Sequence, residues 1–361
     1  MSTAGRGRIK WIFAEKSWYA RTENSRIGRR REKGLERMTL KIGIVGTGWF
    51  AGKHADILAA AEGVEIAGIV GSSKNKGEVF GIRYDASGYE SVSEMADRQQ
   101  LDAVYICVPP MAHGEIEREL IERGIPFLVE KPLGTDAEVP QDILGFMRLK
   151  SSELITSVGY HFRYQDNVDR LREALHPGRI GMATGMWMGD MPQAKWWRRQ
   201  EQSGGQFIEQ TTHIVDLLRY CAGEVDEVQA VYASRFPEEE WEQTNVHDIG
   251  TVTLKMKSGA VASISNTCVL PAGVGQAGLS FYAREGLWEW TPGHLSATRA
   301  EEKHVFAEES DPYVRQTEAF LHALRTGDSS RIRSDYADAC KTQEVTFAAL
   351  QSALSGRSMK L

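Results

Sequence analysis

The 361-residue sequence predicts an α/β protein in which a doubly wound parallel sheet is followed by an α+β domain with a large, mostly antiparallel open sheet. Between residues 40 and 158, continuous apolar segments alternate with helical patterns, which is typical of a parallel sheet covered by helices on both faces. Beyond residue 160, strand patterns follow one another without helices between them, which indicates antiparallel pairing. We therefore expect one domain over residues 38–158 and a second over residues 159–361.

The first domain begins with an apolar strand at residue 40 that runs directly into a glycine-rich turn and the start of a helix. Each later apolar segment is short and borders a stretch with helical periodicity, as in successive strand–helix units. The further expected strands are 64–70, 101–108, 125–129 and 154–158. The expected helices are 53–62, 74–82, 91–99, 114–123 and 138–150.

The second domain opens with helical patterns and continues with a series of strand-like segments. Within this series, residues 256–260 carry a Lys-Ser-Gly hairpin signal between two apolar segments. The expected helices are 165–175, 205–221, 312–326 and 335–354. The expected strands are 183–190, 226–236, 247–257, 260–269, 278–284 and 286–290.

The composition is that of an ordinary globular protein, with 42% hydrophobic and 25% charged residues. No apolar run approaches the ~20 residues of a membrane span, so no membrane partner is expected. The four cysteines lie far apart without a C-x-x-C pair, which argues against disulfides and a structural zinc site and favours a cytoplasmic protein. The net charge of −6 gives no reason to expect a nucleic-acid partner.

Residues 1–37 differ from the rest of the chain because they contain 11 Lys/Arg and 4 Asp/Glu, a net charge of +7 (11 − 4). A basic segment of this kind can bind nucleic acid or a membrane, or act as a transit peptide. Met38, however, stands two residues before the first strand, where such a domain normally begins. We therefore expect residues 1–37 to be a disordered extension that arises from an upstream start.

The turn after the first strand carries the dinucleotide-binding pattern G-x-G-x-x-G/A in Gly46, Gly48 and Ala51. In this pattern the first glycine allows the tight turn, the second lets a pyrophosphate approach the backbone, and the small third residue lets the helix pack on the strand. The pyrophosphate would lie at the helix N-terminus, where unpaired N–H groups favour anions. We include Trp49 and Phe50, within the same stretch, among the expected cofactor contacts. The alternative is a glycine turn that binds no cofactor.

The end of the second strand indicates which nicotinamide cofactor binds. NAD-selective folds usually place an acidic residue there for the ribose 2′-hydroxyl, but this chain has Gly-Ser-Ser-Lys-Asn-Lys at residues 71–76. Two hydroxyls and two lysines can bind a 2′-phosphate. The sequence therefore favours NADP over NAD, with Ser72, Ser73 and Lys74 as contacts. If the segment is only a solvated turn, either cofactor binds.

Two later strand ends carry further candidates, at the edge where ligands bind in doubly wound sheets. Pro109 follows one strand and His113 stands near the start of the next helix; both are candidate cofactor contacts, with purely structural roles as the alternative. Glu130 and Lys131 follow the next strand. A lysine beside a nicotinamide can hydrogen-bond a substrate hydroxyl and assist proton transfer, whereas taken alone such a lysine is usually surface charge.

Glu209, His213 and Asp216 are spaced i, i+4 and i+7, which places them on one face of the expected helix 205–221. A histidine with an orienting carboxylate is a natural acid–base unit. The alternatives are a buried structural network or a metal site. No second histidine or cysteine cluster accompanies these residues, so we expect no metal.

Aromatic and basic residues precede this helix. Trp196 and Trp197 offer indoles that stack on sugars and nicotinamide, and Arg198 offers a guanidinium for phosphate. For each tryptophan, packing in the core is an equally good explanation.

Together these motifs resemble the Gfo/Idh/MocA family, which includes glucose–fructose oxidoreductase and inositol dehydrogenase. The similarity runs from about Met38 to the C-terminus, and the Glu-Lys-Pro that follows a strand at residue 130 is quite specific. The motifs that share the order and spacing of the family are the glycine turn, 102–109 with His113, 130–132, 159–164 and 204–216. The resemblance implies an N-terminal Rossmann domain and a C-terminal domain that binds substrate and whose open sheet commonly forms the face of a homodimer or homotetramer.

The resemblance also implies roles for individual residues. Lys131 and His213 match the catalytic pair of the family, and Trp197-Arg198 matches a pair near the cofactor. Many relatives have aspartate four residues before the histidine, whereas this chain has Glu209, with one more methylene. The expected substrate contacts are Tyr160, Arg163, Trp196 and Asp216.

The sequence thus predicts an NAD(P)-dependent oxidoreductase that transfers hydride between nicotinamide and a secondary alcohol or ketone of a sugar or cyclitol. In this hypothesis His213 takes the hydroxyl proton, Glu209 orients His213, and Lys131 polarises the same oxygen. The alternative is a non-catalytic regulator that senses a sugar or the cofactor and acts through a protein partner. The presence of both Lys131 and His213 argues against that alternative, because a sensor needs no proton-transfer pair.

Overall fold

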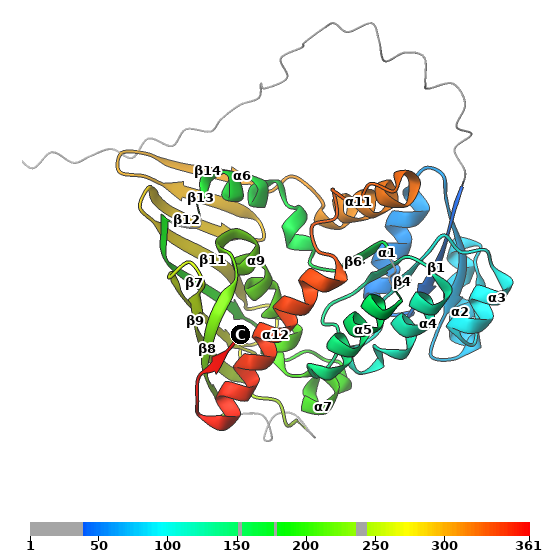
Figure 1. Ribbon diagram of the computed structural model, residues 1–361, viewed down its shortest axis with the longest axis horizontal. Helices are drawn as coiled ribbons and strands as arrows, with labels where there is room; N and C mark the ends of the chain where they lie inside the picture. Colours follow the sequence, from blue (N-terminus) through cyan, green and yellow to red (C-terminus); the bar gives the residue numbers. More distant parts are fainter. Residues whose placement is uncertain (1–38, 151–153, 177–178, 236–243) are drawn as a thin grey trace, which may run out of the picture.

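The computed structural model describes residues 39–150, 154–176, 179–235 and 244–361. The expected N-terminal extension, residues 1–37, lies outside these described residues. The described chain forms a six-stranded sheet and a nine-stranded sheet, with helices packed between them and on the outside (Figure 1). The predicted fold class is confirmed.

The six-stranded sheet is parallel throughout, with the order β3-β2-β1-β4-β5-β6. This is the strand order of a dinucleotide-binding doubly wound sheet. Its strands are β1 (Leu40–Val45), β2 (Val64–Val70), β3 (Ser87–Tyr89), β4 (Ala103–Ile106), β5 (Phe127–Val129) and β6 (Thr156–Val158). Its helices are α1 (Trp49–Ala60), α2 (Lys74–Gly81), α3 (Val92–Arg98), α4 (Glu115–Arg123) and α5 (Glu138–Leu149). The sequence had not predicted β3, a three-residue strand without an apolar run.

The nine-stranded sheet has the order β14-β13-β12-β11-β7-β10-β9-β8-β15. Only its central pair, β7 with β10, is parallel, and the other neighbouring pairs are antiparallel. Its strands are β7 (Ile180–Met188), β8 (Val225–Ala233), β9 (Ile249–Met256), β10 (Val261–Thr267), β11 (Gln276–Ala283), β12 (Gly286–Thr291), β13 (His294–Thr298), β14 (Lys303–Ala307) and β15 (Met359–Lys360). The sequence had not predicted β13, β14 or β15.

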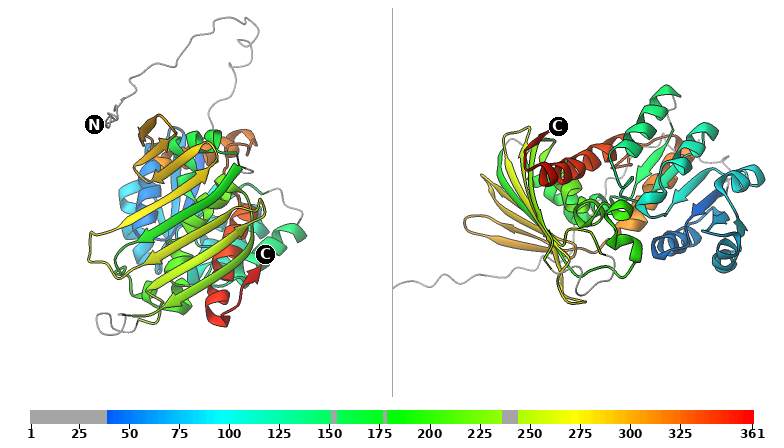
Figure 2. Two further views of the ribbon diagram at one scale, coloured as in Figure 1. Left: turned by 90° about the vertical axis from the view of Figure 1, so that its left-hand side faces the viewer. Right: turned by 90° about the horizontal axis from the view of Figure 1, so that it is seen from below.

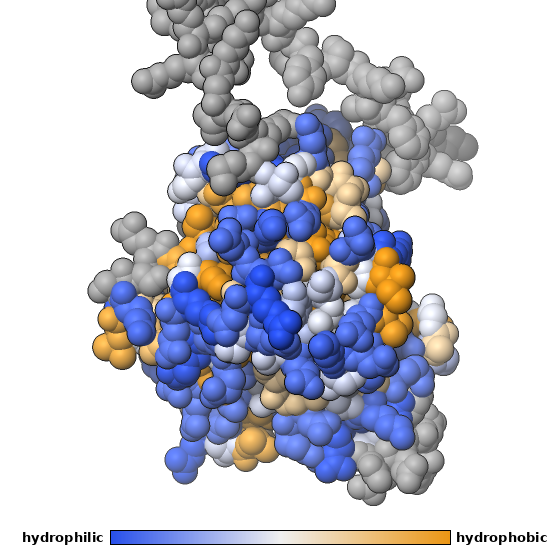
Figure 3. Space-filling model, turned by 90° about the vertical axis from the view of Figure 1, so that its right-hand side faces the viewer, coloured by the Kyte–Doolittle hydropathy of each residue, from blue (hydrophilic) through white to orange (hydrophobic). Residues whose placement is uncertain are grey.

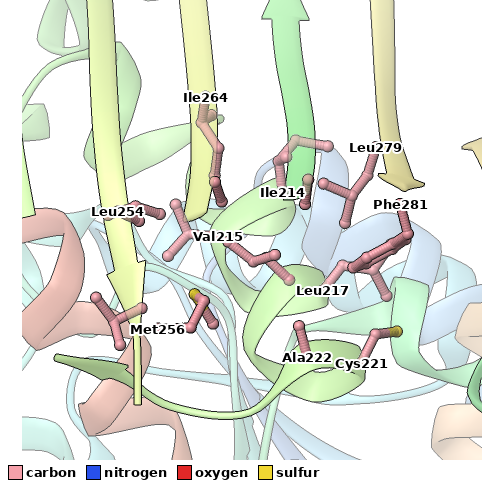
Figure 4. Close-up of a cluster of buried hydrophobic side chains, with 14 of the residues drawn as sticks. Ile214, Val215, Leu217, Cys221, Ala222, Leu254, Met256, Ile264, Leu279 and Phe281 are labelled. Atoms are coloured by element: carbon pink, nitrogen blue, oxygen red, sulfur yellow. The ribbon is translucent and has the colours of Figure 1, made fainter. Parts of the chain in front are cut away.

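Helices cover one face of this second sheet and leave the other open, as the left view of Figure 2 shows. Strand β9 illustrates the difference between the covered and the open face, because Val252, Leu254 and Met256 are buried while the residues between them are exposed. On the covered side, Ile214 and Leu217 of α9 (Thr212–Ala222) belong to the same buried cluster as these residues (Figure 4). Burial of this alternating apolar face stabilises the sheet by roughly 25 cal/mol per Å² of apolar area removed from water.

The C-terminal helices pack against the first sheet as well as the second. Phe320 of α11 (Pro312–Thr326) joins the buried cluster that contains Ile42 and Ile44 of β1. Tyr336 of α12 (Tyr336–Ser355) joins the cluster around β4 and β5, and the same helix lies along β8. The two predicted domains therefore share a continuous packed interface.

No helix in the described parts of the chain is long and apolar enough to cross a membrane. The face beside the parallel sheet is largely hydrophilic, with hydrophobic side chains gathered in separate patches (Figure 3).

Candidate functional site

A pocket of about 790 Å³ lies where β1, β2, β4 and β5 end. The glycine turn at residues 46–48 forms one part of its wall, and Lys131 and Glu209 form another. The volume is typical of a small-molecule site. The predicted residues that line it are Gly46, Gly48, Trp49, Phe50, Ser72, Pro109, Glu130, Lys131, Trp196 and Glu209.

The two glycines of the turn differ in what they allow. Gly46 has φ of +116°, and a Cβ there would stand 2.2 Å from the carbonyl oxygen of Cys107. Gly48, which caps α1, would place a Cβ with no protein atom within 4 Å. Gly46 is thus required by the backbone itself, whereas Gly48 leaves open space at the helix N-terminus, where a pyrophosphate would fit. Ala51 is completely buried, as the packing of the helix requires.

The serine–lysine segment divides between the pocket and the helix that follows. Lys76 donates a hydrogen bond from Nζ to Ser72 Oγ at 2.9 Å, and Ser72 lines the pocket. Ser73 instead caps α2 by accepting a hydrogen bond from the Lys76 backbone. Lys74 is not among the lining residues. Within this segment, the lysine that bonds to a pocket-lining residue is therefore Lys76 rather than the predicted Lys74.

Lys131 hydrogen-bonds to Glu209, the residue that was expected to orient His213. Its Nζ donates hydrogen bonds to Glu209 Oε1 at 3.0 Å and to the Glu209 backbone oxygen at 2.9 Å. The second oxygen of the carboxylate, Oε2, accepts a hydrogen bond from Trp197 Nε1 at 2.7 Å. Trp197 is buried and does not line the pocket, so in this structure its indole contacts Glu209.

His213 stands apart from this carboxylate because the expected helix 205–221 is broken. The chain forms α8 (Gln206–Glu209), turns at Gln210 and Thr211, and begins α9 at Thr212. The His213 ring contacts aromatic rings instead, and its buried Nδ1 has no hydrogen-bond partner in the described part of the chain. Burial, and then the charge of Lys131, lower the pKa of His213 well below its usual range, so its imidazole is neutral at pH 7.

Two predicted substrate contacts pair with each other inside the protein. Arg163, in the 3-10 helix η3 (His161–Tyr164), donates to Asp216 from Nε at 2.7 Å and from Nη2 at 2.6 Å. Its Nη1 lies 2.6 Å from Asp338 Oδ2. Both members of the pair are almost fully buried, and neither lines the pocket.

Other predicted residues also find partners away from the pocket. The Tyr160 hydroxyl lies 3.0 Å from Thr212 Oγ1. His113 is buried, with Nδ1 2.6 Å from Glu117 Oε1. Arg198, in the 3-10 helix η5 (Lys195–Arg198), donates to the backbone oxygens of Pro192 and Gln193.

His54 is a residue of the site that the sequence analysis missed. Its Nε2 lies 2.8 Å from Glu130 Oε1, and both side chains are buried. Although burial alone would raise the pKa of Glu130, the hydrogen bond and charge of His54 and the charge of Lys131 lower it. The sequence could have indicated His54 by its spacing, because it lies three residues after Ala51 and so on the same buried face of α1.

Within the described residues, no group of three or more His, Cys, Asp or Glu side chains is placed to hold a metal ion. The residues that line the pocket and were not predicted include Thr47, Ser91, Glu115 and Glu119.

Known proteins of similar sequence include oxidoreductases. A family described as "Oxidoreductase family, NAD-binding Rossmann fold" matches residues 40–160, and the "GFO/IDH/MocA C-terminal domain" matches residues 168–288. Myo-inositol 2-dehydrogenase of Thermotoga maritima is 24% identical over 342 residues, which cover 89% of this chain and 98% of that protein. Levoglucosan dehydrogenase of Pseudarthrobacter phenanthrenivorans is 23% identical over 234 residues, 59% of each chain.

Solved structures share the fold. The structure of GenD2 from gentamicin A biosynthesis in complex with NAD superposes with a TM-score of 0.76 at 22% identity, over 90% of this chain and 97% of that one. Aldose–aldose oxidoreductase from Caulobacter crescentus superposes with a TM-score of 0.78 at 19% identity, over 90% and 100% of the two chains. The two family matches together span well over half of the sequence. The chain therefore belongs to the GFO/IDH/MocA family of NAD-binding oxidoreductases.

Proposed function

We propose that this protein is a sugar or cyclitol oxidoreductase that transfers hydride between a nicotinamide cofactor and a secondary alcohol or ketone. The observation that carries the proposal is that a single pocket joins the glycine turn at Gly46 and Gly48 to the ammonium group of Lys131. The open space at Gly48, at the N-terminus of α1, fits the pyrophosphate of a dinucleotide. When bound, the nicotinamide supplies the hydride acceptor or donor.

The protein's own groups divide the remaining chemistry between them. His213, which is neutral at pH 7, takes the proton of the substrate hydroxyl at a ring nitrogen. Lys131 donates a hydrogen bond from Nζ to the same oxygen and so stabilises the charge that develops there. Glu209 positions Lys131 by accepting two of its hydrogen bonds, through the carboxylate and the backbone oxygen.

The assignment of Glu209 differs from the expectation based on the sequence. A carboxylate that contacts the lysine and an indole, rather than the histidine, supports a positioning role toward Lys131. Among the expected substrate contacts, Trp196 keeps that role in the proposal because it lines the pocket. Tyr160, Arg163 and Asp216 serve the packing around the site through their buried partners.

We propose NADP as the preferred cofactor, with NAD as the alternative. The pocket is lined by Ser72, whose hydroxyl is bonded to the Lys76 ammonium, and the second strand ends without an acidic residue. This pair offers a hydroxyl and a positive charge to a 2′-phosphate.

The experiment that tests the proposed function is an absorbance assay at 340 nm. Purified full-length protein is given NADP or NAD with a panel of hexoses, pentoses, anhydrosugars and inositols, and the reduced cofactors with the matching ketones. We expect turnover with at least one sugar or cyclitol and faster turnover with NADP. Cofactor binding without turnover on any member of the panel would contradict the proposal and favour a sensor that acts through a protein partner.

A further inference from the structure

We propose, on the basis of the function proposed above, that His161 is the proton-accepting partner of His213. In this scheme His161 never touches the substrate. It takes over the proton that His213 has removed from the substrate hydroxyl and releases that proton to water.

The surroundings of His213 lead to this inference. The rings that contact it belong to Tyr160, His161, Phe162 and Trp187, and no carboxylate of the described residues hydrogen-bonds to it. The centroids of the His161 and His213 rings lie 4.9 Å apart, with the rings close to perpendicular. Of the four contacting side chains, only histidine exchanges a proton readily near neutral pH. Tyr160 is excluded because burial raises the pKa of its hydroxyl far above neutral pH.

A positive charge is better stabilised on His161 than on His213. His161 experiences the negative charge of Glu130 and forms a hydrogen bond with the Gly159 backbone, and both favour the protonated ring. His213 has no such favourable neighbour, since Lys131 and His161 both disfavour its protonation. Transfer from His213 to His161 therefore moves the proton to the ring whose protonated form the Glu130 carboxylate stabilises.

His161 begins this transfer in the neutral form that can accept a proton. Burial, with the charges of Lys131 and His54, lowers its pKa to about 4, although Glu130 acts in the opposite direction. Its other face stacks on Tyr313 of α11 at a centroid distance of 4.1 Å. The Lys53 ammonium lies 4.4 Å from the centroid of the same tyrosine ring. These contacts hold the His161 ring in place beside His213.

The proton balance of alcohol oxidation is then complete. A bound nicotinamide would accept the hydride of the substrate C–H bond, and the proton of the O–H bond passes to His213. A rotation of the His213 ring about χ2, a broad torsion in histidine, brings the protonated nitrogen toward His161, which accepts the proton. His161 is 8% exposed, so water can remove the proton and restore both neutral rings.

Two variants and one control test the partnership. His161→Phe keeps an aromatic ring for the stack on Tyr313 but cannot carry a proton, and His161→Ala leaves room for added imidazole. Phe162→Leu is the matched control, because Phe162 also contacts the His213 ring, with centroids 5.2 Å apart, and carries no proton.

The kinetic measurement uses the full-length enzyme with its best sugar across pH 5–9. We expect kcat for alcohol oxidation to fall by about tenfold or more in His161→Phe, with the KM for cofactor unchanged. We also expect added imidazole to restore part of the activity of His161→Ala, and Phe162→Leu to keep the wild-type pH profile. A kcat of His161→Phe within twofold of wild type, with an unchanged pH profile, would overturn the proposal.

A second measurement does not depend on turnover. Histidine ring NMR signals of the cofactor-bound protein are titrated in wild type and in His161→Phe. We expect the His213 titration to move to higher pH in the variant, because a repelling neighbour has been removed. Superimposable His213 titrations would overturn the coupling, even if no substrate were found and the proposed function itself had failed.

Discussion

The carboxylate of Glu209 gives the two candidate proton-handling residues different surroundings. It bonds Lys131 and the Trp197 indole, while His213, four residues later, is enclosed by aromatic rings. An ammonium beside a carboxylate is suited to donate a hydrogen bond to a developing oxyanion. A buried imidazole that is neutral at pH 7 is able to accept a proton. The turn at Gln210 and Thr211 thus separates the two roles.

Lys76 is the residue on which cofactor preference depends most directly. Replacing it with alanine removes a charge-assisted contact worth about 1.5–3 kcal/mol, so we expect the Kd for NADP to rise about 10- to 100-fold and that for NAD to stay nearly constant. Fluorescence titration measures both constants. Lys74→Ala is the matched control, because Lys76, and not Lys74, bonds to the pocket-lining Ser72. Equal effects of the two substitutions would refute the assignment.

The sequence predicted the residues of the site well where a local motif fixes their position. It predicted them poorly where the position of a side chain depends on a partner that is distant in the sequence. Gly46, Gly48 and Lys131 follow strands that all end at one edge, so their presence at the pocket could be predicted. The ion-pair partners of Arg163 could not be predicted in the same way. Its guanidinium is bound by carboxylates of α9 and α12, including Asp338, 175 residues away in the sequence.

At the scale of elements, the break between α8 and α9 shows the limit of a periodic pattern. The spacing of Glu209 and His213 suits one helix face, yet Gln210 and Thr211 form a turn between two helices. The apolar residues of α9 still pack on the second sheet, so the pattern predicted the buried face correctly (Figure 4). It could not reveal the turn, because helical periodicity survives a short interruption. The strands β13 and β14 were missed because few of their residues are buried.

In the turn from β1 to α1, we expect position 46 to require glycine. Gly46→Ala would force a Cβ to within 2.2 Å of the Cys107 oxygen and keep an L-residue at positive φ, which alone costs roughly 1–2 kcal/mol. We expect loss of cofactor binding and a lower free energy of unfolding, measured by urea denaturation.

The control for this prediction lies six residues later, inside α1. Gly52→Ala meets no atom within 4 Å and sits inside α1, where alanine is favoured over glycine by about 1 kcal/mol. We expect this variant to be as stable as wild type or more so. If Gly46→Ala matched it in stability and cofactor affinity, the structural account of the turn would be wrong.

At the scale of the whole molecule, the open face of the second sheet is the surface that we propose for homo-oligomer formation (Figure 2). Tyr282, Met182 and Val261 lie side by side on β11, β7 and β10, and each is 44% exposed. The neighbouring row consists of hydroxyl side chains, Thr184 and Ser263 among them. An exposed apolar strip on a broad sheet face is typical of a subunit interface.

Met182→Arg tests this surface by placing a charge at the centre of the strip. We expect light scattering to report a dimer or tetramer for wild type and a smaller species for the variant, because an unpaired buried charge is costly. Val79→Arg is the control, since Val79 is an exposed apolar residue of α2, a helix that belongs to the six-stranded sheet. A monomeric wild type, or an assembly unaffected by Met182→Arg, would contradict the proposal.

The central claim, that Lys131 and His213 perform the proton chemistry beside a bound nicotinamide, is tested most directly by steady-state turnover of Lys131→Ala and His213→Ala. Cofactor dissociation constants are measured in parallel, and His294→Ala, an exposed histidine on β13, serves as the control. We expect a kcat lower by about 10²-fold or more in each of the two variants, with cofactor affinity nearly unchanged. Turnover like that of wild type in either variant would contradict it.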